Sequence, residues 1–369
     1  MSRAPFIHAR LRMAVLVAVV GGACGGRTGL DDGTTVLTSG PGGPDGSVVP
    51  QGFCGATPTA LASAQPDPVA LAVDATHVYW TTQPIGVVTT GGVMKAPLAG
   101  GPTTTLASPQ QGPLAIVVDA TSVYWTDQWG GSVMKTPLGG GPITPLAPNQ
   151  GQNNPSYLAV DAKSVYWTNF GDECAPTGSV QKVPLDGGAI TSLAGGQAEP
   201  WQVAIDADAI YWVDVTEAQQ TGATVMKVGL DGSQLTTLAT GLTWPEAIAI
   251  DSDSVYFTNT GTRAANYEDG AVMRVAKMGG AATTIAAGQW VPAGIAVDDS
   301  NVYWVDSGLA DGMGTVMMAP KGGGAPVVLA SGQDSPGAIV VDASCVYWTN
   351  VGTSAKNDAD GAVMMVAKK

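Results

Sequence analysis

The stretch AIDADAIYWVD at residues 204–214 decides the fold, because the same phrase returns along the chain. It reads AVDAKSVYWTN at 159–169, AIDSDSVYFTN at 249–259 and AVDDSNVYWVD at 296–306. The leading aspartates lie 42 to 47 residues apart, at Asp74, Asp119, Asp161, Asp206, Asp251, Asp298 and Asp342. Internal periods of about 40 to 50 residues are typical of propellers and solenoids. The phrase therefore indicates a repeated structural unit rather than a catalytic site.

Each unit is predicted to contain four short strands. In the fourth unit, residues 203–206 form an apolar run that ends in aspartate, and residues 210–214 are aromatic and β-branched. The side chain of Asp206 can bond the backbone two residues further on and so close the turn between these strands. Two further strands are predicted at 224–230 and 235–239, joined by an Asp-Gly hairpin signal. Four antiparallel strands, repeated without helices between them, predict the blade of an all-β propeller.

The two ends of the chain predict how the ring closes. The last unit stops after its third strand, with AVMMVAKK at 362–369. A surplus strand stands at the other end, where TPTALAS at 57–63 matches TTTLAS at 103–108. The N-terminal strand should complete the last blade, which removes the exposed edges of an open sheet. The sequence thus predicts a seven-bladed β-propeller with four antiparallel strands per blade.

Residues 225–259 resemble the YWTD repeats of propellers of the low-density-lipoprotein-receptor class B type, with kinship to NHL-type repeats. The resemblance covers about residues 57–369. Receptor propellers of this type usually have six blades, and the fourth motif position varies here. It is occupied by Thr82, Asp127, Asn169, Asp214, Asn259, Asp306 and Asn350. The resemblance implies an architecture and a binding habit, but no activity, because one fold hosts many functions.

The N-terminal residues predict that the protein is exported from the cytoplasm. Residues 1–23 combine arginines, a short apolar run and small residues, which is the pattern of a bacterial export signal. Cleavage after Ala23 would leave Cys24 first, as in a lipoprotein signal, so lipid attachment at Cys24 is predicted; ordinary secretion is the alternative. Residues 24–52 are rich in Gly, Pro, Asp, Ser and Thr and are predicted to form a flexible tether to a propeller at 53–369. The expected location is the cell envelope, with membrane contact only through the lipid, and otherwise the periplasm or the medium.

Composition argues against nucleic acid and against most catalytic centres. The formal net charge is −14, so the chain lacks the basic surface that binding to nucleic-acid phosphates requires. The only histidines are His8, in the signal, and His77, in a predicted turn, so a catalytic triad, a zinc site and a lactonase-type centre lack their parts. The residues after the blade-joining prolines contain a single acid: Val69, Leu114, Ser156, Trp201, Glu246, Ala293 and Gly337. We therefore predict no catalytic residues, no metal site and no cofactor.

Calcium binding is the alternative to the absence of a cofactor. The segment NDADG at 357–361 has oxygen ligands at alternate positions, as calcium loops do, but it lacks the distal glutamate. Acids are common in the loops between second and third strands, and solvated loop acids are the favoured explanation. These acids are Asp172, Glu173, Glu217, Glu268, Asp269, Asp311, Asp358 and Asp360.

Aromatic residues outside the repeat are the candidate ligand-binding residues. They fall in the second-to-third-strand loops or the blade-joining loops, which share one face of a propeller. The candidates are Trp129, Tyr157, Phe170, Trp201, Trp244, Tyr267 and Trp290, together with the acid Glu246. Aromatic rings beside carboxylates suit sugar faces, peptides or cationic groups. The alternative is that each ring fills the gap between two blades, and this alternative is favoured for Trp244 and Trp290, which flank the blade-joining Pro245 and Pro292.

These observations predict a non-enzymatic envelope protein that binds or scaffolds a glycan, peptide or protein partner. The competing interpretations are a propeller-type hydrolase or lyase of lactonase-like character and a purely structural envelope protein. A disulfide between Cys54, which precedes the closing strand, and Cys345, in the first turn of the last blade, is also predicted. Cys174 has no evident intramolecular partner.

Overall fold

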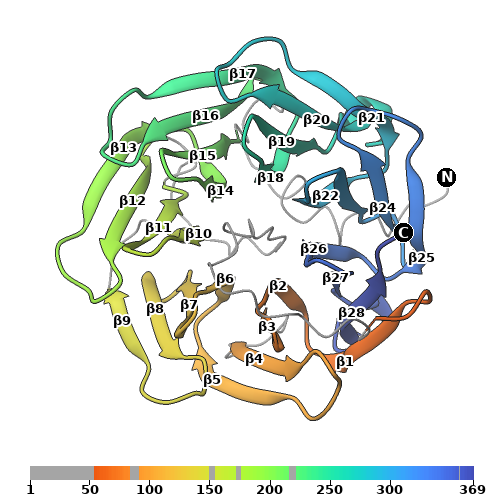
Figure 1. The fold of residues 1–369 in the computed structure, drawn as a ribbon, viewed down its shortest axis with the longest axis horizontal. Helices are drawn as coiled ribbons and strands as arrows, with labels where there is room; N and C mark the ends of the chain where they lie inside the picture. The colour runs from red at the N-terminus through yellow and green to blue at the C-terminus, as the bar shows by residue number, and fades with distance from the viewer. Residues whose placement is uncertain (1–53, 84–90, 149–153, 172–175, 216–221, 357) are drawn as a thin grey trace, which may run out of the picture.

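The computed structural model describes residues 54–83, 91–148, 154–171, 176–215, 222–356 and 358–369. Seven four-stranded antiparallel sheets are arranged as blades around a central axis (Figure 1). Blade 1 comprises strands β2 to β5, and the blades follow in chain order to blade 7, which comprises β26 to β28 and β1. The prediction of an all-β, seven-bladed propeller is confirmed.

The innermost strands surround the axis and pack against the innermost strands of both neighbouring blades (Figure 1). They are the apolar runs of the sequence, and each begins at a proline whose missing N–H is not needed there. The innermost strands are β2 (Pro68–Val73), β6 (Pro113–Val118), β10 (Pro155–Val160), β14 (Pro200–Ile205), β18 (Pro245–Ile250), β22 (Pro292–Val297) and β26 (Pro336–Val341).

The second strands carry the aromatic motif and the third strands the Val-Met-Lys pattern. The second strands are β3 (His77–Thr82), β7 (Ser122–Asp127), β11 (Ser164–Asn169), β15 (Ala209–Asp214), β19 (Ser254–Asn259), β23 (Asn301–Asp306) and β27 (Cys345–Asn350). The third strands are β4 (Gly91–Pro97), β8 (Ser132–Pro137), β12 (Gly178–Pro184), β16 (Ala223–Gly229), β20 (Gly270–Ala276), β24 (Gly314–Pro320) and β28 (Gly361–Ala367).

The outermost strands form the edges of the blades and bury only part of their residues. They are β5 (Thr104–Gln110), β9 (Thr144–Ala147), β13 (Thr191–Gln197), β17 (Thr236–Leu242), β21 (Thr283–Gln289), β25 (Val327–Gln333) and β1 (Thr59–Gln65). Two single-turn 3-10 helices, η2 (Arg263–Ala265) and η3 (Ser354–Lys356), stand in loops. Among the described residues, no helix has the length and apolarity needed to cross a membrane.

The ring closes between the two ends of the chain. Strand β1 pairs antiparallel with β28, from Thr59 opposite Met365 to Gln65 opposite Gly361 (Figure 1). A disulfide joins Cys54, just before β1, to Cys345 at the start of β27, with their Cα atoms 6.0 Å apart. The predicted closure by the N-terminal strand is confirmed.

The aromatic motif fills the space between the blades. Its Trp and Tyr side chains are fully buried, and Phe257 replaces Trp in blade 5. The hydroxyl of Thr126 donates to the carbonyl of Ser156 in the next blade at 2.7 Å, and Thr168 donates in the same way to Trp201. A buried hydroxyl that finds a neighbouring carbonyl removes the cost of its own burial and fixes how the blades dock.

The propeller has two different ends. The turn end carries the tight turns between first and second strands and between third and fourth strands. The loop end carries the second-to-third-strand loops and the blade-joining loops. At the loop end, the residue before each blade-joining proline has a positive φ. Its carbonyl accepts a hydrogen bond from the backbone N–H of the residue that follows the fourth motif position. The acceptors are Asp67, Gly112, Asn154, Glu199, Trp244, Val291 and Ser335.

Candidate functional site

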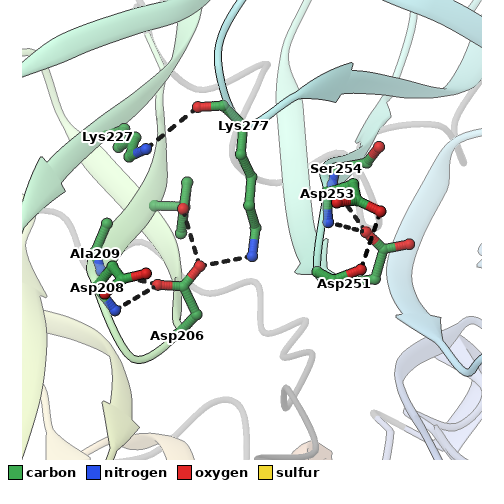
Figure 2. A network of polar contacts seen from close by, with 10 residues as sticks. Asp206, Asp208, Ala209, Lys227, Asp251, Asp253, Ser254 and Lys277 are labelled. Atoms are coloured by element: carbon green, nitrogen blue, oxygen red, sulfur yellow. Dashed lines mark hydrogen bonds and ion pairs between the residues drawn. The ribbon is translucent and has the colours of Figure 1, made fainter.

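The repeated aspartate and tyrosine form one contact at the turn end of every blade. In all seven blades the tyrosine hydroxyl donates to the aspartate five residues before it, at 2.7 to 3.0 Å. The other oxygen of Asp206 accepts the backbone N–H groups of Asp208 and Ala209, which closes the turn (Figure 2). Burial and the bond to Asp251 raise the pKa of Tyr256 to about 12. Seven copies of one saturated contact serve the fold and offer no free group for chemistry.

Three lysines extend this contact between blades. Lys277 reaches from blade 5 to Asp206 of blade 4 at 2.6 Å, as Figure 2 shows, and Lys321 reaches Asp251 at 2.8 Å. Lys368 of blade 7 pairs with Asp298 of blade 6 in the same way at 2.7 Å. Burial alone would raise the pKa of Asp251, but bonds from Lys321 and neighbouring donors lower it to about 2. These ion pairs join blades 4 to 7.

Three carboxyls at the fourth motif position are buried at the loop end. Burial raises the pKa of Asp127 to about 6 and the pKa values of Asp214 and Asp306 to about 7. The indole N–H of Trp212 donates to Asp214 at 2.9 Å, and Trp167 donates likewise to Asn169. Since asparagine performs the same task in another blade, the position is structural, and charge on it is unfavourable.

Three of the predicted binding aromatics lie inside the molecule. Tyr157, Phe170 and Trp201 are buried and meet edge to face between blades 3 and 4, with ring centroids 4.8 Å and 5.6 Å from Trp201. This is the gap-filling arrangement that the sequence left open as the alternative. Sequence spacing could not decide it, because the direction of Trp201 depends on which side chains stand on the next blade.

Three more candidates are partly or fully covered in blade 5. Trp244 is half-buried and its backbone adopts φ 59°, and Glu246 accepts a bond from Thr260 at 3.2 Å. Tyr267 is buried, and its hydroxyl has no hydrogen-bond partner. Burial raises the pKa of Tyr267. This group presents little of its aromatic surface to a ligand.

Trp129 and Trp290 remain exposed at the loop end. Their side chains are 44% and 39% accessible, in blade 2 and in the loop that joins blades 5 and 6. The backbone N–H of Trp129 donates to the carbonyl of Gln111, and the carbonyl of Trp290 accepts from Gly308. Both residues thus occupy the same kind of loop-to-loop contact. The exposure of Trp290 differs from the gap-filling role that its sequence position favoured, and ligand binding by either ring stays a prediction.

Two glutamines that the sequence analysis did not single out lie beside this face. Gln83 and Gln128 follow the fourth motif position in blades 1 and 2, and both side chains are buried. The Nε2 atom of Gln83 and the Oε1 atom of Gln128 have no hydrogen-bond partner. The only sequence signal was that these two repeats carry an amide where the others carry different residues, Phe170, Val215, Thr260, Ser307 and Val351.

The other residues considered in the sequence analysis lie away from the loop end or outside the described residues. Cys24, Cys174, Asp172, Glu173 and Glu217 lie outside them. His77 begins β3 at the turn end, far from the loops of the candidate face. Within the ranges that the structure describes, no group of three or more His, Cys, Asp or Glu side chains is placed to hold a metal ion.

The weak calcium pattern ends in an occupied carboxylate. Asp360 accepts the backbone N–H and the hydroxyl of Thr353, and it pairs with Lys356 at 3.4 Å. Asp269 bonds Thr262 in the same manner in blade 5. Both acids close their own loops.

Sequence comparison identifies the repeat. Residues 208–252 match the family model described as low-density lipoprotein receptor repeat class B. This segment runs from the turn of blade 4 to the turn of blade 5, so it spans one complete repeat. No curated protein matches the chain with significance.

Solved structures share the architecture. A virginiamycin B lyase from Staphylococcus aureus aligns with a TM-score of 0.63 at 14% identity, over 84% of this chain and 99% of that one. A streptogramin B lyase gives 0.61 at 13% identity, over 84% and 97%. A puromycin-hydrolyzing peptidase from Mycobacterium tuberculosis gives 0.59 at 15% identity, over 86% and 53%. Likeness at this level of identity shows the propeller fold alone.

Proposed function

We propose that this protein, a seven-bladed β-propeller with class B (YWTD) repeats of the low-density lipoprotein receptor type, is a non-enzymatic binding or scaffold protein of the cell envelope. Its loop end presents a binding face to a glycan, peptide or protein. One observation carries the proposal: two indole side chains, Trp129 and Trp290, are held exposed at that end by backbone hydrogen bonds. Large aromatic side chains are costly to leave in water, so exposed ones mark a surface that a partner covers.

The test is thermal unfolding of the full chain against panels of glycans, peptides and divalent cations, followed by Trp fluorescence. We expect a ligand that raises Tm and perturbs the emission, with both effects reduced in Trp129→Ala or Trp290→Ala. A shift with calcium alone would give the loop carboxylates a role. If no panel member and no envelope component binds, the protein is a purely structural envelope component.

A hydrolase or lyase is the second candidate, because the lyase and peptidase structures share the fold and because burial, with a smaller contribution from Glu199, raises the pKa of Asp214 to about 7. Raised pKa values of buried carboxyls are common at active sites. Turnover of a panel ligand that is lost in Asp214→Asn would favour the enzyme. Retained ligand binding without turnover favours the binding protein.

Location in the envelope rests on the N-terminal sequence. We propose that cleavage after Ala23 exposes Cys24 for lipid attachment, which would tether the propeller through residues 24–52. Mass spectrometry of the mature N-terminus is the measurement. A lipid adduct that disappears in Cys24→Ser supports the anchor, and an unmodified mature protein in the medium supports secretion.

A further inference from the structure

We propose that the carboxyl of Asp127 is a pH-sensitive switch for the exposed indole of Trp129. The protonated carboxyl holds the loop that carries the indole, and the ionised carboxylate releases that loop. We call residues 128–131 the Trp129 loop. The inference rests on the proposed binding function and names a regulation of its exposed aromatic face.

The Trp129 loop is bonded directly to the Asp127 carboxyl. Asp127 ends β7, and the backbone N–H groups of Gln111 and Gly130 bond to its carboxyl. A Cβ atom added to Gly130 would lie 3.0 Å from Cγ and 3.0 Å from Oδ2 of Asp127, so the backbone of the loop lies against the carboxyl group. The N–H groups of Trp129 and Gly130 also donate to the carbonyl of Gln111, at 3.0 and 3.3 Å. The carboxyl, the blade-joining loop and the Trp129 loop thus form one hydrogen-bonded unit.

This unit supports the indole. A Cβ atom added to Gly112 would lie 2.7 Å from Cδ2 and 3.1 Å from Cε2 of Trp129, so the ring lies on the α-carbon of Gly112. The N–H of Gln128 donates to the carbonyl of the same glycine at 2.9 Å. The Trp129 side chain is still 44% accessible. Movement of the loop away from the blade-joining loop therefore takes the indole off its support.

The carboxyl of Asp127 is buried where a charge is unfavourable. The residue is 9% exposed, and its Oδ1 atom has no hydrogen-bond partner. Burial raises the pKa of Asp127 to about 6, although the two backbone bonds lower it. A buried carboxylate without enough donors is stabilised by water. Water reaches the ionised group when the loop that lies against it moves away.

The segments packed around Asp127 bring no charge to it. Lys135 of β8 donates at the turn end to a carbonyl of blade 3, and Tyr157 of β10 packs between blades 3 and 4. On β7 itself, Tyr124 bonds Asp119 at the turn end. Among the described residues, no charged side chain contributes to the shifted pKa of Asp127. Its ionisation therefore depends on burial and on the two backbone bonds.

The fold does not need an acid at this position. In blade 3 the equivalent Asn169 accepts a bond from the motif tryptophan at 3.1 Å. In blade 2 the indole of Trp125 donates to Gln110 instead, at 3.0 Å, so the carboxyl of Asp127 is left to the Trp129 loop. Asparagine occupies the position in blades 3, 5 and 7, and Asp127→Asn is therefore compatible with the fold.

The expected size of the effect follows from linkage. In the released loop the carboxyl regains the usual aspartate pKa of 3.8, against about 6 in the closed loop. The ratio of released to closed loop should therefore rise from about pH 4 and level off above about pH 6, by about a hundredfold in all. Short segments of a folded protein open in this way without global unfolding.

The experiment is amide hydrogen exchange of the full chain between pH 4 and pH 8, with rates corrected for the intrinsic effect of pH. The N–H groups of Trp129 and Gly130 are the reporters, because the closed loop bonds both of them. We expect their corrected rates to rise about a hundredfold and to level off above about pH 6. In Asp127→Asn the corrected rates should not change with pH. Asp127→Thr, which introduces the residue of blade 1, is the second variant and should behave likewise.

Two controls separate the switch from a general response to pH. The N–H of Phe170 makes the loop-end bond of blade 3 beside the uncharged Asn169, and its corrected rate should stay constant. Asp214→Asn removes the equivalent carboxyl in blade 4 and should leave the response of Trp129 unchanged. If the corrected rate of Trp129 stays constant in the unaltered protein, or rises equally in Asp127→Asn, the switch is overturned.

The switch and the proposed function fail separately. Hydrogen exchange uses no ligand, so a constant rate overturns the switch and leaves binding to the thermal unfolding panel with Trp129→Ala and Trp290→Ala. Conversely, if no panel member binds, a rate that follows the protonation of Asp127 still supports the switch.

Discussion

At the turn end, seven aspartates accept seven tyrosine hydroxyls in the same geometry, whereas at the loop end the equivalent positions differ from blade to blade. Every group in the repeated contact is partnered. The unpartnered buried atoms include those of Gln83, Gln128 and Tyr267, and these lie in loops of the loop end. The difference teaches that repetition marks what each blade needs, and that departures from the repeat mark where binding can be sought.

The turn end also differs between its two halves. In blades 5 to 7 the residue after the third strand is a lysine that pairs with the aspartate of the preceding blade. In blades 1 to 4 the same position is apolar, at Leu98, Leu138, Leu185 and Leu230. A lysine of the third strand joins those blades, as when Lys135 donates to the carbonyl of Leu185 at 3.1 Å. The same contact stands beside the ion pairs, from Lys227 to the carbonyl of Lys277 and from Arg274 to the carbonyl of Lys321. The ion pairs are thus an addition to a contact that both halves share.

The largest expected effect concerns the closure at the turn end. Loss of the Cys54–Cys345 disulfide should lower the free energy of unfolding by about 4 to 5 kcal/mol, because it spans 291 residues and restricts the unfolded chain. Urea unfolding of the double variant Cys54→Ser, Cys345→Ser is the measurement. Reductant should destabilise the unaltered protein to the level of this variant, and the variant itself should not respond. Equal midpoints would mean that β1 and β28 hold the ring without the cross-link.

The second prediction concerns the loop end. Asp306→Asn should stabilise the protein at pH 8 by about 2 kcal/mol. The folded pKa of about 7 lies above the usual aspartate pKa of 3.8, so stability from this group is full below about pH 4 and is lost as the pH rises through 7. Thermal unfolding between pH 4 and pH 8 should show a smaller decline in the variant. If Tm declines between pH 4 and pH 8 as steeply in the variant as in the unaltered protein, the Asp306 carboxyl is not the group responsible. Asp231→Asn, at an exposed turn, is the control.

The third prediction breaks one of the seven repeated contacts. Tyr303→Phe removes the hydroxyl that donates to Asp298 at 2.8 Å and should cost about 1.5 kcal/mol, as for hydrogen bonds to charged groups. The ring itself stays, so its packing is kept. Tyr267→Phe at the loop end is the matched comparison and should cost nothing, because that hydroxyl has no partner. Equal losses in chemical unfolding would contradict the contrast between the two ends.

Much of this architecture could be predicted from the sequence. The strands, the number of blades and the closure by residues 57–63 follow from periodicity, since every blade repeats the same local pattern. Whether Trp201 faces a ligand or Phe170 could not be predicted, because it depends on contacts between blades. The pairing of Lys277 with Asp206, which lie 71 residues apart, has no local signal either. The unpartnered amide of Gln128 appears only when every surrounding donor is known.

The smallest expected effect tests the two halves of the turn end. Lys321→Leu gives blade 6 the residue that blades 1 to 4 carry and should cost about 1 kcal/mol at pH 7, since Asp251 keeps the bonds from Tyr256 and two backbone N–H groups and stays partly solvated. The difference between the variant and the unaltered protein should be full above about pH 4 and should shrink as the pH falls towards 2. The pKa of Asp251 is about 2 with Lys321 present, so its stabilisation persists above pH 4 and is lost as the pH falls towards 2. Without the lysine that pKa should rise, and acid unfolding should begin at a higher pH. Identical acid midpoints for Lys321→Leu and the unaltered protein would mean that Tyr256 and the backbone N–H groups alone hold the aspartate charged, as they must in the leucine half of the ring.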